Sequence, residues 1–259
     1  MAFFLLSTTV AITRAGFVDS ALSTVAGCEG SGALLIGSSV ARGRDALPLS
    51  SSGWSSLLAD ELCARYGLRL VNEAVDSATV ATTRGRVDAL LQRHHPHTVV
   101  IGLSTGNEGL SRAATASVAE AIAEQYESDL MALAHHVAAF PSVSLVVLGG
   151  VYPSDQNQPH HLHALRSLNA RLLASAFPVI DFLRATDDGH GHWRANENSD
   201  GTHPNTLGHL IMFEAINVSI FKRQEAPRGA PSQSSTRADD GRGTRGKEQA
   251  LQPQVSPGV

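Results

Sequence analysis

Three short polar segments of the chain carry residue types from which a nucleophilic active site can be built. The segment Gly37-Ser38-Ser39 places two hydroxyls beside a glycine, and Asn107 supplies a side-chain amide within Ser-Thr-Gly-Asn-Glu-Gly. Further along the chain, Asp200 and His203 lie three positions apart in Asp-Gly-Thr-His-Pro. This spacing lets a carboxylate orient an imidazole, which can then take a proton from a serine hydroxyl. The residues therefore predict acyl-transfer chemistry.

Each of these segments lies next to an element that the apolar pattern predicts. The serines follow an apolar run at 33–37, and Asn107 follows another at 97–102. Pro204, directly after His203, is typical of the first turn of a helix. In open parallel sheets, ligands bind beyond the carboxyl ends of the strands. The loops after these runs are therefore where we expect the chemistry.

The rest of the pattern predicts an α/β fold in which buried strands alternate with amphipathic helices. Continuous apolar strands of this kind are covered on both faces, which favours a parallel sheet between two helical layers. We expect a three-layer α/β/α sandwich with a central, mostly parallel five-stranded sheet, as in flavodoxin-like folds. The expected strands are 33–37, 68–71, 97–102, 144–149 and 179–182, and the expected helices are 54–66, 83–92, 115–140, 161–176 and 204–221.

Taken together, the Gly-x-Ser block, the Asn block and the final Asp-x-x-His-Pro block resemble the SGNH, or GDSL, hydrolases in order and spacing. The resemblance covers about residues 32–221. It implies that Ser39 is the nucleophile, His203 the general base and Asp200 the carboxylate that orients it. It implies no cofactor and no metal. Ser38 is an alternative nucleophile, but the family's spacing to Gly43 selects Ser39.

The resemblance also implies an oxyanion hole, and here the sequence departs from the family pattern. Asn107 matches the side-chain donor, the Ser39 N–H is a second donor, and Ser77 stands where the family has a glycine. If that glycine has a positive φ, a serine there brings strain or a shifted loop. Ser38 replaces the aspartate of the GDSL motif, which is not the nucleophile.

The function expected on this basis is hydrolysis of carboxylic esters through an acyl-enzyme on Ser39. Small acyl esters or O-acetylated carbohydrate are the preferred substrates, with a lipid acylhydrolase or acyltransferase as an alternative. A non-catalytic binding protein that keeps the fold is a second alternative, motivated by the changes at Ser38 and Ser77. Tyr152 and Trp193 are candidates for binding the substrate, although packing roles are equally open.

Histidine and cysteine add little to this interpretation. The chain has twelve histidines, several of them clustered, but no His-Glu-x-x-His motif, so we expect most to be solvated and none to bind a metal. Cys28 and Cys63 are too few for a disulfide framework, and a chain of this size can fold without one.

Composition bounds the remaining possibilities. The chain has 259 residues, of which 42% are hydrophobic and 17% charged, so a sizeable core can form. The net charge is −4; residues 222–259 contribute seven Lys and Arg against four Asp and Glu, or +3, which leaves −7 for residues 1–221. An acidic body argues against nucleic-acid binding, which needs a basic face.

The two ends of the chain differ from its body. Residues 1–31 are expected to form an N-terminal extension or a leader, because an apolar run at 1–12 precedes Val-Ala-Gly-Cys at 25–28, which looks like a lipoprotein cleavage box. The run is too short to span a bilayer, so we expect no transmembrane segment. Residues 222–259, rich in Pro, Gly, Ser and Arg, are expected to be disordered. A cytoplasmic and a secreted location both remain open.

Overall fold

The computed structural model describes Cys28 and residues 32–222. The expected leader, apart from Cys28, and the expected tail from residue 223 onward lie outside these residues. No helix within the described part combines the length and the apolar character that a membrane crossing requires.

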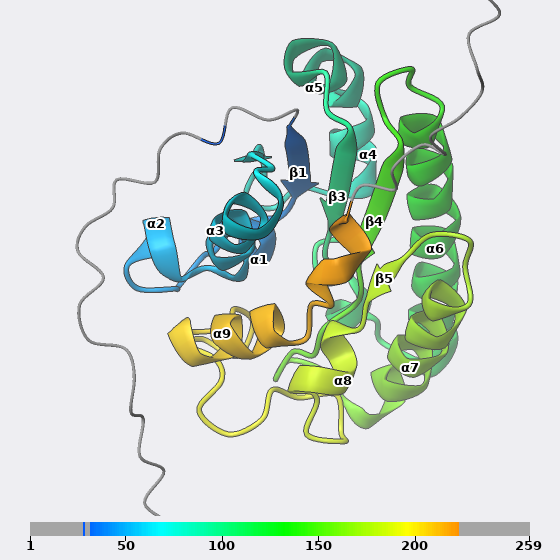
Figure 1. The fold of residues 1–259 in the computed structure, drawn as a ribbon. Helices are drawn as coiled ribbons and strands as arrows, with labels where there is room; N and C mark the ends of the chain where they lie inside the picture. Colours follow the sequence, from blue (N-terminus) through cyan, green and yellow to red (C-terminus); the bar gives the residue numbers. More distant parts are fainter. Residues whose placement is uncertain (1–27, 29–31, 223–259) are drawn as a thin grey trace, which may run out of the picture. The chain divides into compact units, whose positions relative to one another are not determined.

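A five-stranded sheet forms the centre of the domain, and all its strand pairs are parallel (Figure 1). The strand order is β2-β1-β3-β4-β5. This confirms the predicted sheet. Every residue of β1 and β3 is buried, because helices cover both faces of the sheet. The strands are β1 (Ala33–Gly37), β2 (Leu70–Asn72), β3 (Thr98–Gly102), β4 (Leu145–Gly149) and β5 (Val179–Ile180).

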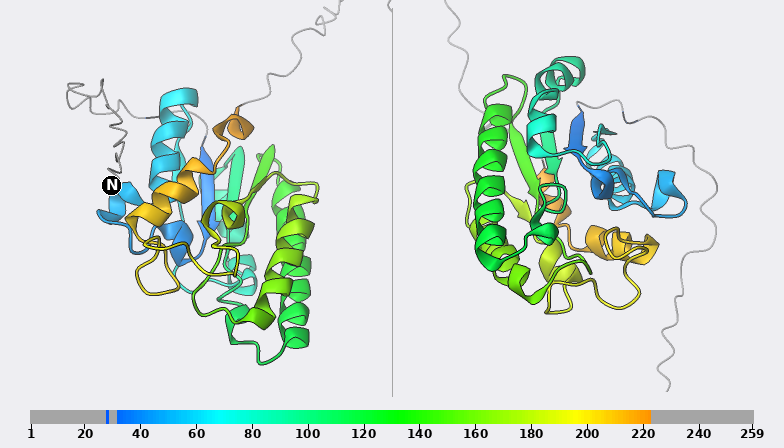
Figure 2. Two further views of the ribbon diagram at one scale, coloured as in Figure 1. Left: turned by 90° about the horizontal axis from the view of Figure 1, so that it is seen from below. Right: turned by 180° about the vertical axis from the view of Figure 1, so that it is seen from behind.

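Two separate apolar clusters cover the faces of the sheet, as the alternation within its strands requires. In β1, Leu34 and Ile36 belong to one cluster, whereas Ala33 and Leu35 belong to the other. The first cluster packs under α4 (Val80–Arg84), α5 (Val87–His94), α6 (Ala116–Ala138) and α7 (Pro159–Leu173). The second packs under α1 (Ser39–Arg42), α3 (Trp54–Tyr66) and α9 (Thr206–Glu214), on the opposite side of the sheet (Figure 2). The predicted three layers are therefore present.

Capping side chains change several of the predicted boundaries. Thr79 and Thr82 form a capping box that starts α4, so the helix expected at 83–92 is two helices, α4 and α5. The strand expected at 179–182 ends at Ile180, because the Asp181 carboxylate accepts from the Arg184 N–H and starts α8 (Phe182–Thr186). Likewise, Asn217 caps η2 (Val218–Phe221), which is separate from α9. The remaining short helices are α2 (Leu49–Ser52) and η1 (Leu110–Arg112).

A disulfide joins Cys28 to Cys63 on α3, with their Cα atoms 5.8 Å apart. The composition did not predict this bond. It attaches Cys28 covalently to α3, and the two cysteines are separated by 35 positions in the sequence. Because such a link restricts the unfolded chain more than the folded one, it stabilises this part of the domain.

Glycine at the end of β1 lets two backbones approach each other. A Cβ atom at Gly37 would lie 2.4 Å from the Gly102 carbonyl oxygen and 2.5 Å from Cβ of Ala41. Any side chain at this position would therefore separate β1 from β3 or lift α1 away from the sheet. The close contact sets the position of α1, which begins at Ser39.

Candidate active site

The candidate residues meet where the strand order reverses. From β1 the chain continues to β2 on one side, whereas β3 lies on the other side, and such a point opens a crevice at the carboxyl ends of the strands. Ser39 begins α1, two residues after the end of β1, Asn107 lies in the loop after β3, and His203 lies in the loop before α9. Residues far apart in sequence are brought to one edge of the sheet.

A chain of two hydrogen bonds links Ser39, His203 and Asp200. Oγ of Ser39 lies 3.1 Å from Nε2 of His203, and Nδ1 of the same ring lies 2.8 Å from Oδ2 of Asp200. Since a carboxylate can only accept, Nδ1 carries the proton and Nε2 is left to accept from the serine hydroxyl. This is the arrangement of a Ser-His-Asp triad. Ser39 is 7% exposed, so the hydroxyl lies at the base of the crevice.

Asp200 is held as an anion by its own loop. Its Oδ1 accepts from the backbone N–H groups of His203 and Thr202, at 2.7 and 2.8 Å. Partial burial on its own would raise the pKa of Asp200, but the hydrogen bonds from the His203 ring and from the two N–H groups outweigh it and lower the pKa to about 2. The carboxylate is therefore charged at neutral pH.

The start of α9 fixes the loop that carries His203. The side chain of Asn205 accepts from the N–H groups of Leu207 and Gly208 and donates to the carbonyls of Asn196 and Asn198. Gly208 packs so closely that a Cβ there would lie 2.1 Å from the Glu197 carbonyl oxygen. The cap thus ties the helix to the preceding loop on both sides of His203.

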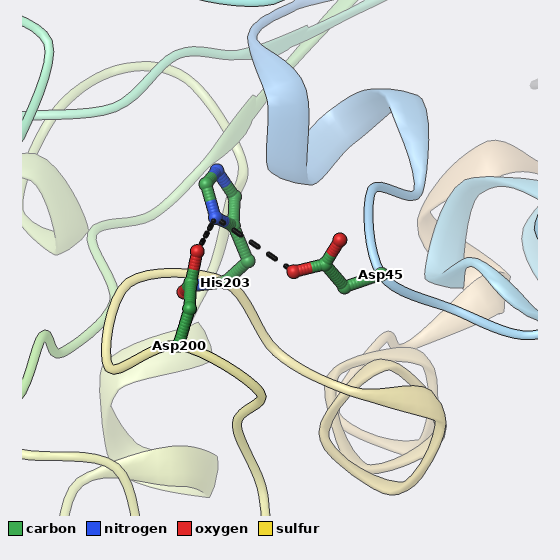
Figure 3. A group of neighbouring side chains, drawn as sticks. All are labelled: Asp45, Asp200 and His203. Carbon is green, nitrogen blue, oxygen red and sulfur yellow. Dashed lines mark hydrogen bonds and ion pairs between the residues drawn. The ribbon is translucent and has the colours of Figure 1, made fainter.

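A second carboxylate, Asp45, also faces the imidazole (Figure 3). Its Oδ2 lies 4.0 Å from Nδ1 of His203 and accepts from Oγ of Ser199 at 2.5 Å. Asp45 has a φ of +68°, which is unusual for a residue with a side chain. Asp45 is not predicted as a site residue from the sequence, because it belongs to none of the three motifs and lies six positions after Ser39.

Within residues 32–222, Asp45, Asp200 and His203 form the one cluster of side chains whose ligand atoms lie close enough together to hold a cation. One ligand atom from each of Asp45, Asp200 and His203 lies within 4.8 Å of the others. However, Nδ1 of His203 already donates to Asp200, so a cation would have to displace that proton and break the hydrogen-bond chain. The arrangement fits proton transfer better than metal binding.

The two loops that carry the expected oxyanion donors are joined by two hydrogen bonds. Nδ2 of Asn107 donates to the Ala78 carbonyl at 3.0 Å, and the Glu108 carboxylate accepts from the Val80 N–H at 2.8 Å. The amide of Asn107 has two N–H groups, so one remains for a ligand. Ser77 has a φ of +61°, the left-handed conformation that glycine would favour, and it lines the cavity in front of Ser39.

Ser38 does not contact the imidazole. Its side chain is fully buried, its N–H donates to the Gly102 carbonyl at 3.0 Å, and its hydroxyl has no hydrogen-bond partner within residues 32–222. The structure therefore brings Ser39, and not its neighbour, to His203.

A cavity of about 230 Å³ opens in front of Ser39 and His203. Its wall, as formed by residues 32–222, is mainly polar, with hydroxyl, amide and guanidinium groups and no carboxylate side chain. The residues that line it are Ser39, Val40, Arg44, Ser77, Ser104, Thr105, Gly106, Asn107, Leu110, Ser111, Arg112, Tyr152, Pro153, Ser154, Gln156, Asn157, Thr202 and His203.

Of the two aromatic candidates, Tyr152 lines the cavity and Trp193 does not. The Trp193 ring stacks behind Tyr152, with ring centroids 5.9 Å apart and planes 27° apart, and it is 4% exposed. Burial raises the pKa of Tyr152 above its usual value. The structure thus gives Trp193 a packing role behind the cavity wall.

Two histidines differ from the expectation of solvated side chains. His161 is buried, and both it and the adjacent His160 lie within hydrogen-bond distance of the Ala113 carbonyl, at 2.8 and 2.9 Å. His209 is fully buried, accepts from the Trp54 N–H and donates to the Arg44 carbonyl. Each ring serves as a polar link between two segments, which a count of histidines does not reveal.

The comparisons with known proteins agree with this geometry. The sequence model of the GDSL-like lipase/acylhydrolase family matches residues 35–211. No curated protein matches the chain in a sequence comparison.

Solved structures of similar fold include TesA, the acetylxylan esterase Axe2 and the esterase EstA. TesA is 24% identical with a TM-score of 0.55, and the match covers 71% of this chain and 95% of that one. Axe2, an acetylxylan esterase from Geobacillus stearothermophilus, is 20% identical with a TM-score of 0.56, covering 74% and 94%. The psychrotrophic esterase EstA from Pseudoalteromonas sp. is 22% identical with a TM-score of 0.55, covering 74% and 98%.

Proposed function

Because the chain belongs to the GDSL-like lipase/acylhydrolase family, we propose that it hydrolyses carboxylic esters through an acyl-enzyme on Ser39. The observation that carries the proposal is the pair of hydrogen bonds from Ser39 through His203 to Asp200. A serine hydroxyl is a weak nucleophile at neutral pH, and an adjacent oriented base is what activates it.

In the proposed reaction, Oγ of Ser39 attacks the ester carbonyl while Nε2 of His203 takes the hydroxyl proton. The charged Asp200 stabilises the imidazolium that forms. The carbonyl oxygen, now an anion, is held by the Asn107 side chain and by the Ser39 and Ser77 N–H groups. His203 then protonates the leaving alcohol, and water attacks the acyl-enzyme by the same steps in reverse.

The cavity supports small acyl esters or O-acetylated carbohydrate as the substrates. Its wall offers few apolar side chains, mainly Val40, Leu110 and Pro153, whereas a long acyl chain needs an apolar groove. Many hydroxyl and amide groups suit a polar alcohol with several hydrogen-bonding groups. Axe2, a protein of similar fold, is an acetylxylan esterase.

The test compares Ser39→Ala with the parent and with Ser38→Ala. The second variant is a matched control, because it removes the neighbouring hydroxyl, which has no partner in the described part of the chain. With p-nitrophenyl acetate we expect Ser39→Ala to lose at least about 10³-fold in kcat/KM and Ser38→Ala to keep most activity. A fluorophosphonate probe should label the parent and Ser38→Ala only. Equal hydrolysis by Ser39→Ala and the parent would contradict the proposal, and tight ligand binding without labelling would point to a binding protein.

A further inference from the structure

Two arginines reach the cavity, and they differ in their partners. Arg44 pairs with two carboxylates, at 3.6 Å from Asp76 and 3.9 Å from Asp45. Arg112 has no carboxylate within ion-pair distance and makes no side-chain hydrogen bond among residues 32–222. Within the described part of the chain, its positive charge is therefore unpaired.

Among the residues that the structure describes, no carboxylate side chain lines the cavity to balance Arg112. Apart from Arg44, which is paired, and His203, which belongs to the triad, the other side chains of the wall are uncharged. Residues 1–221 as a whole carry a net charge of −7. The positive charge on the cavity wall is therefore opposite in sign to the net charge of this part of the chain. A cleft lined by one sign of charge concentrates ligands of the opposite sign.

The position of Arg112 is fixed by the same loop that carries Asn107. The short helix η1 begins after Gly109, whose φ of +97° makes the turn, and ends at Arg112. The next residue, Ala113, offers its carbonyl to His160 and His161 on α7. The backbone of Arg112 is thus held between the oxyanion loop and α7, so placing the guanidinium beside a bound ester does not require ordering a free loop.

We propose that Arg112 is a specificity-determining residue that binds a carboxylate carried by the ester substrate. The inference rests on the proposed esterase function. A guanidinium presents paired N–H donors that match the two oxygens of a carboxylate, which a neutral substrate would leave unused. The carboxylate can belong to the alcohol, as in an acidic sugar, or to the acyl group, as in the half-ester of a dicarboxylic acid.

Two pairs of esters distinguish these sources. The first pair, 4-acetoxybenzoate and its methyl ester, carries the carboxylate on the alcohol side. The second, 4-nitrophenyl hemisuccinate and its methyl ester, carries it on the acyl side. For each pair we measure kcat/KM and take the ratio of the anionic to the neutral ester. Comparing ratios between parent and variant cancels the intrinsic reactivity of the esters.

We expect one of the two ratios to fall about tenfold in Arg112→Gln, since a hydrogen bond between charged groups is lost. Arg112→Lys keeps the charge without the paired donors and should lose part of the preference. Arg65→Gln on α3 is the matched control, because it removes one positive charge from outside the cavity lining and should leave both ratios unchanged. Because Arg112 is exposed, its replacement leaves the core intact.

Ser39→Ala is measured with all four esters, so that the two proposals can fail separately. Hydrolysis that depends on Ser39, with both ratios the same in parent and Arg112→Gln, overturns the role of Arg112 alone. Hydrolysis that persists in Ser39→Ala overturns the proposed function and, with it, this inference. A fall in one ratio that also occurs in Arg65→Gln would show a general charge effect and would overturn the role of Arg112.

Discussion

The Asp45 carboxylate lies 4.0 Å from Nδ1 of His203, the same ring nitrogen that donates to Asp200. The imidazole therefore faces two carboxylates from different parts of the chain, one from the loop after α1 and one from the loop before α9 (Figure 3). Of the two carboxylates, only Asp200 is within hydrogen-bond distance of the ring, whereas Asp45 accepts a hydrogen bond from Ser199. We infer that Asp200 orients the ring and that Asp45 adds negative potential beside it.

The first prediction separates these two roles. At 4 Å two unit charges interact by about 1 kcal/mol in a water-like environment, and Asp45 is partly exposed to solvent. We therefore expect Asp45→Asn to lower kcat/KM about fivefold, whereas Asp200→Asn should lower it by about 10³–10⁴. Steady-state kinetics with p-nitrophenyl acetate measure both. Equal losses in the two variants would mean that the two carboxylates share the orienting role.

A second prediction concerns Asn107. Removing one oxyanion donor costs about 10²–10³ in rate, so Asn107→Ala should lower kcat by this amount. The side chain also holds the Ala78 carbonyl, so a displaced loop could produce part of the loss. Glu108→Ala breaks the other hydrogen bond between the same loops, to the Val80 N–H, and serves as the control. A loss of similar size in Glu108→Ala would assign the effect to loop position.

The third prediction follows from the left-handed backbone of Ser77. A side chain in this conformation costs about 1–2 kcal/mol of folding free energy, which replacement by glycine would recover. Part of the recovered energy is offset because glycine is more flexible in the unfolded chain. We expect Ser77→Gly to raise the free energy of unfolding by up to about 1 kcal/mol and to keep the activity, because the N–H group remains. Urea unfolding measures the change. Ser77→Ala, which keeps the Cβ atom, should show no such gain, and a gain in both variants would exclude backbone strain as the cause.

A fourth prediction concerns stability at low pH. Burial lowers the pKa of His209 from 6.5 to about 4, because the charged ring would lose its water, and the hydrogen bond to Arg44 offsets this only in part. As pH falls below about 6.5, the unfolded chain binds the proton more readily than the folded one. His209 therefore lowers the free energy of unfolding between about pH 6.5 and pH 4, by up to about 3 kcal/mol.

Urea midpoints at several pH values in this window, for the parent and His209→Gln, isolate this contribution. The variant is expected to be less stable at pH 7.5, because the links to Trp54 and Arg44 are lost, and to lose less stability than the parent on acidification. Parallel curves for the two proteins would contradict the assignment to His209.

Much of the fold follows from local apolar runs. The strands at 33–37 and 98–102 and the helix at 54–66 were predictable because each is a continuous or amphipathic pattern with a clear end, such as Gly67 after α3. The boundaries that differ depend on single side chains. Asp181 and Asn217 each accept from a backbone N–H a few residues on, which turns an apolar run into a new helix.

The candidate site likewise contains residues that the sequence predicts and residues that only the folded structure reveals. Ser39, Asn107, Asp200 and His203 could be named because each stands in a short motif beside a predicted element. Asp45 could not be named, since it approaches His203 only once α1 has packed on the sheet and the loop before α9 lies beside the loop after α1. Buried polar links such as His209, and the disulfide to Cys63, also depend on which elements become neighbours.

The hydrogen bond between Ser39 and His203 joins residues 164 positions apart. Contacts of such long range form only after the entropy of closing the intervening chain has been overcome, which happens late in folding. A partly folded domain can hold β1 and α1 in place and still leave Ser39 without its base. Ester hydrolysis through Ser39 should therefore return during refolding only as fast as the whole sheet assembles, which makes activity a reporter of completed folding.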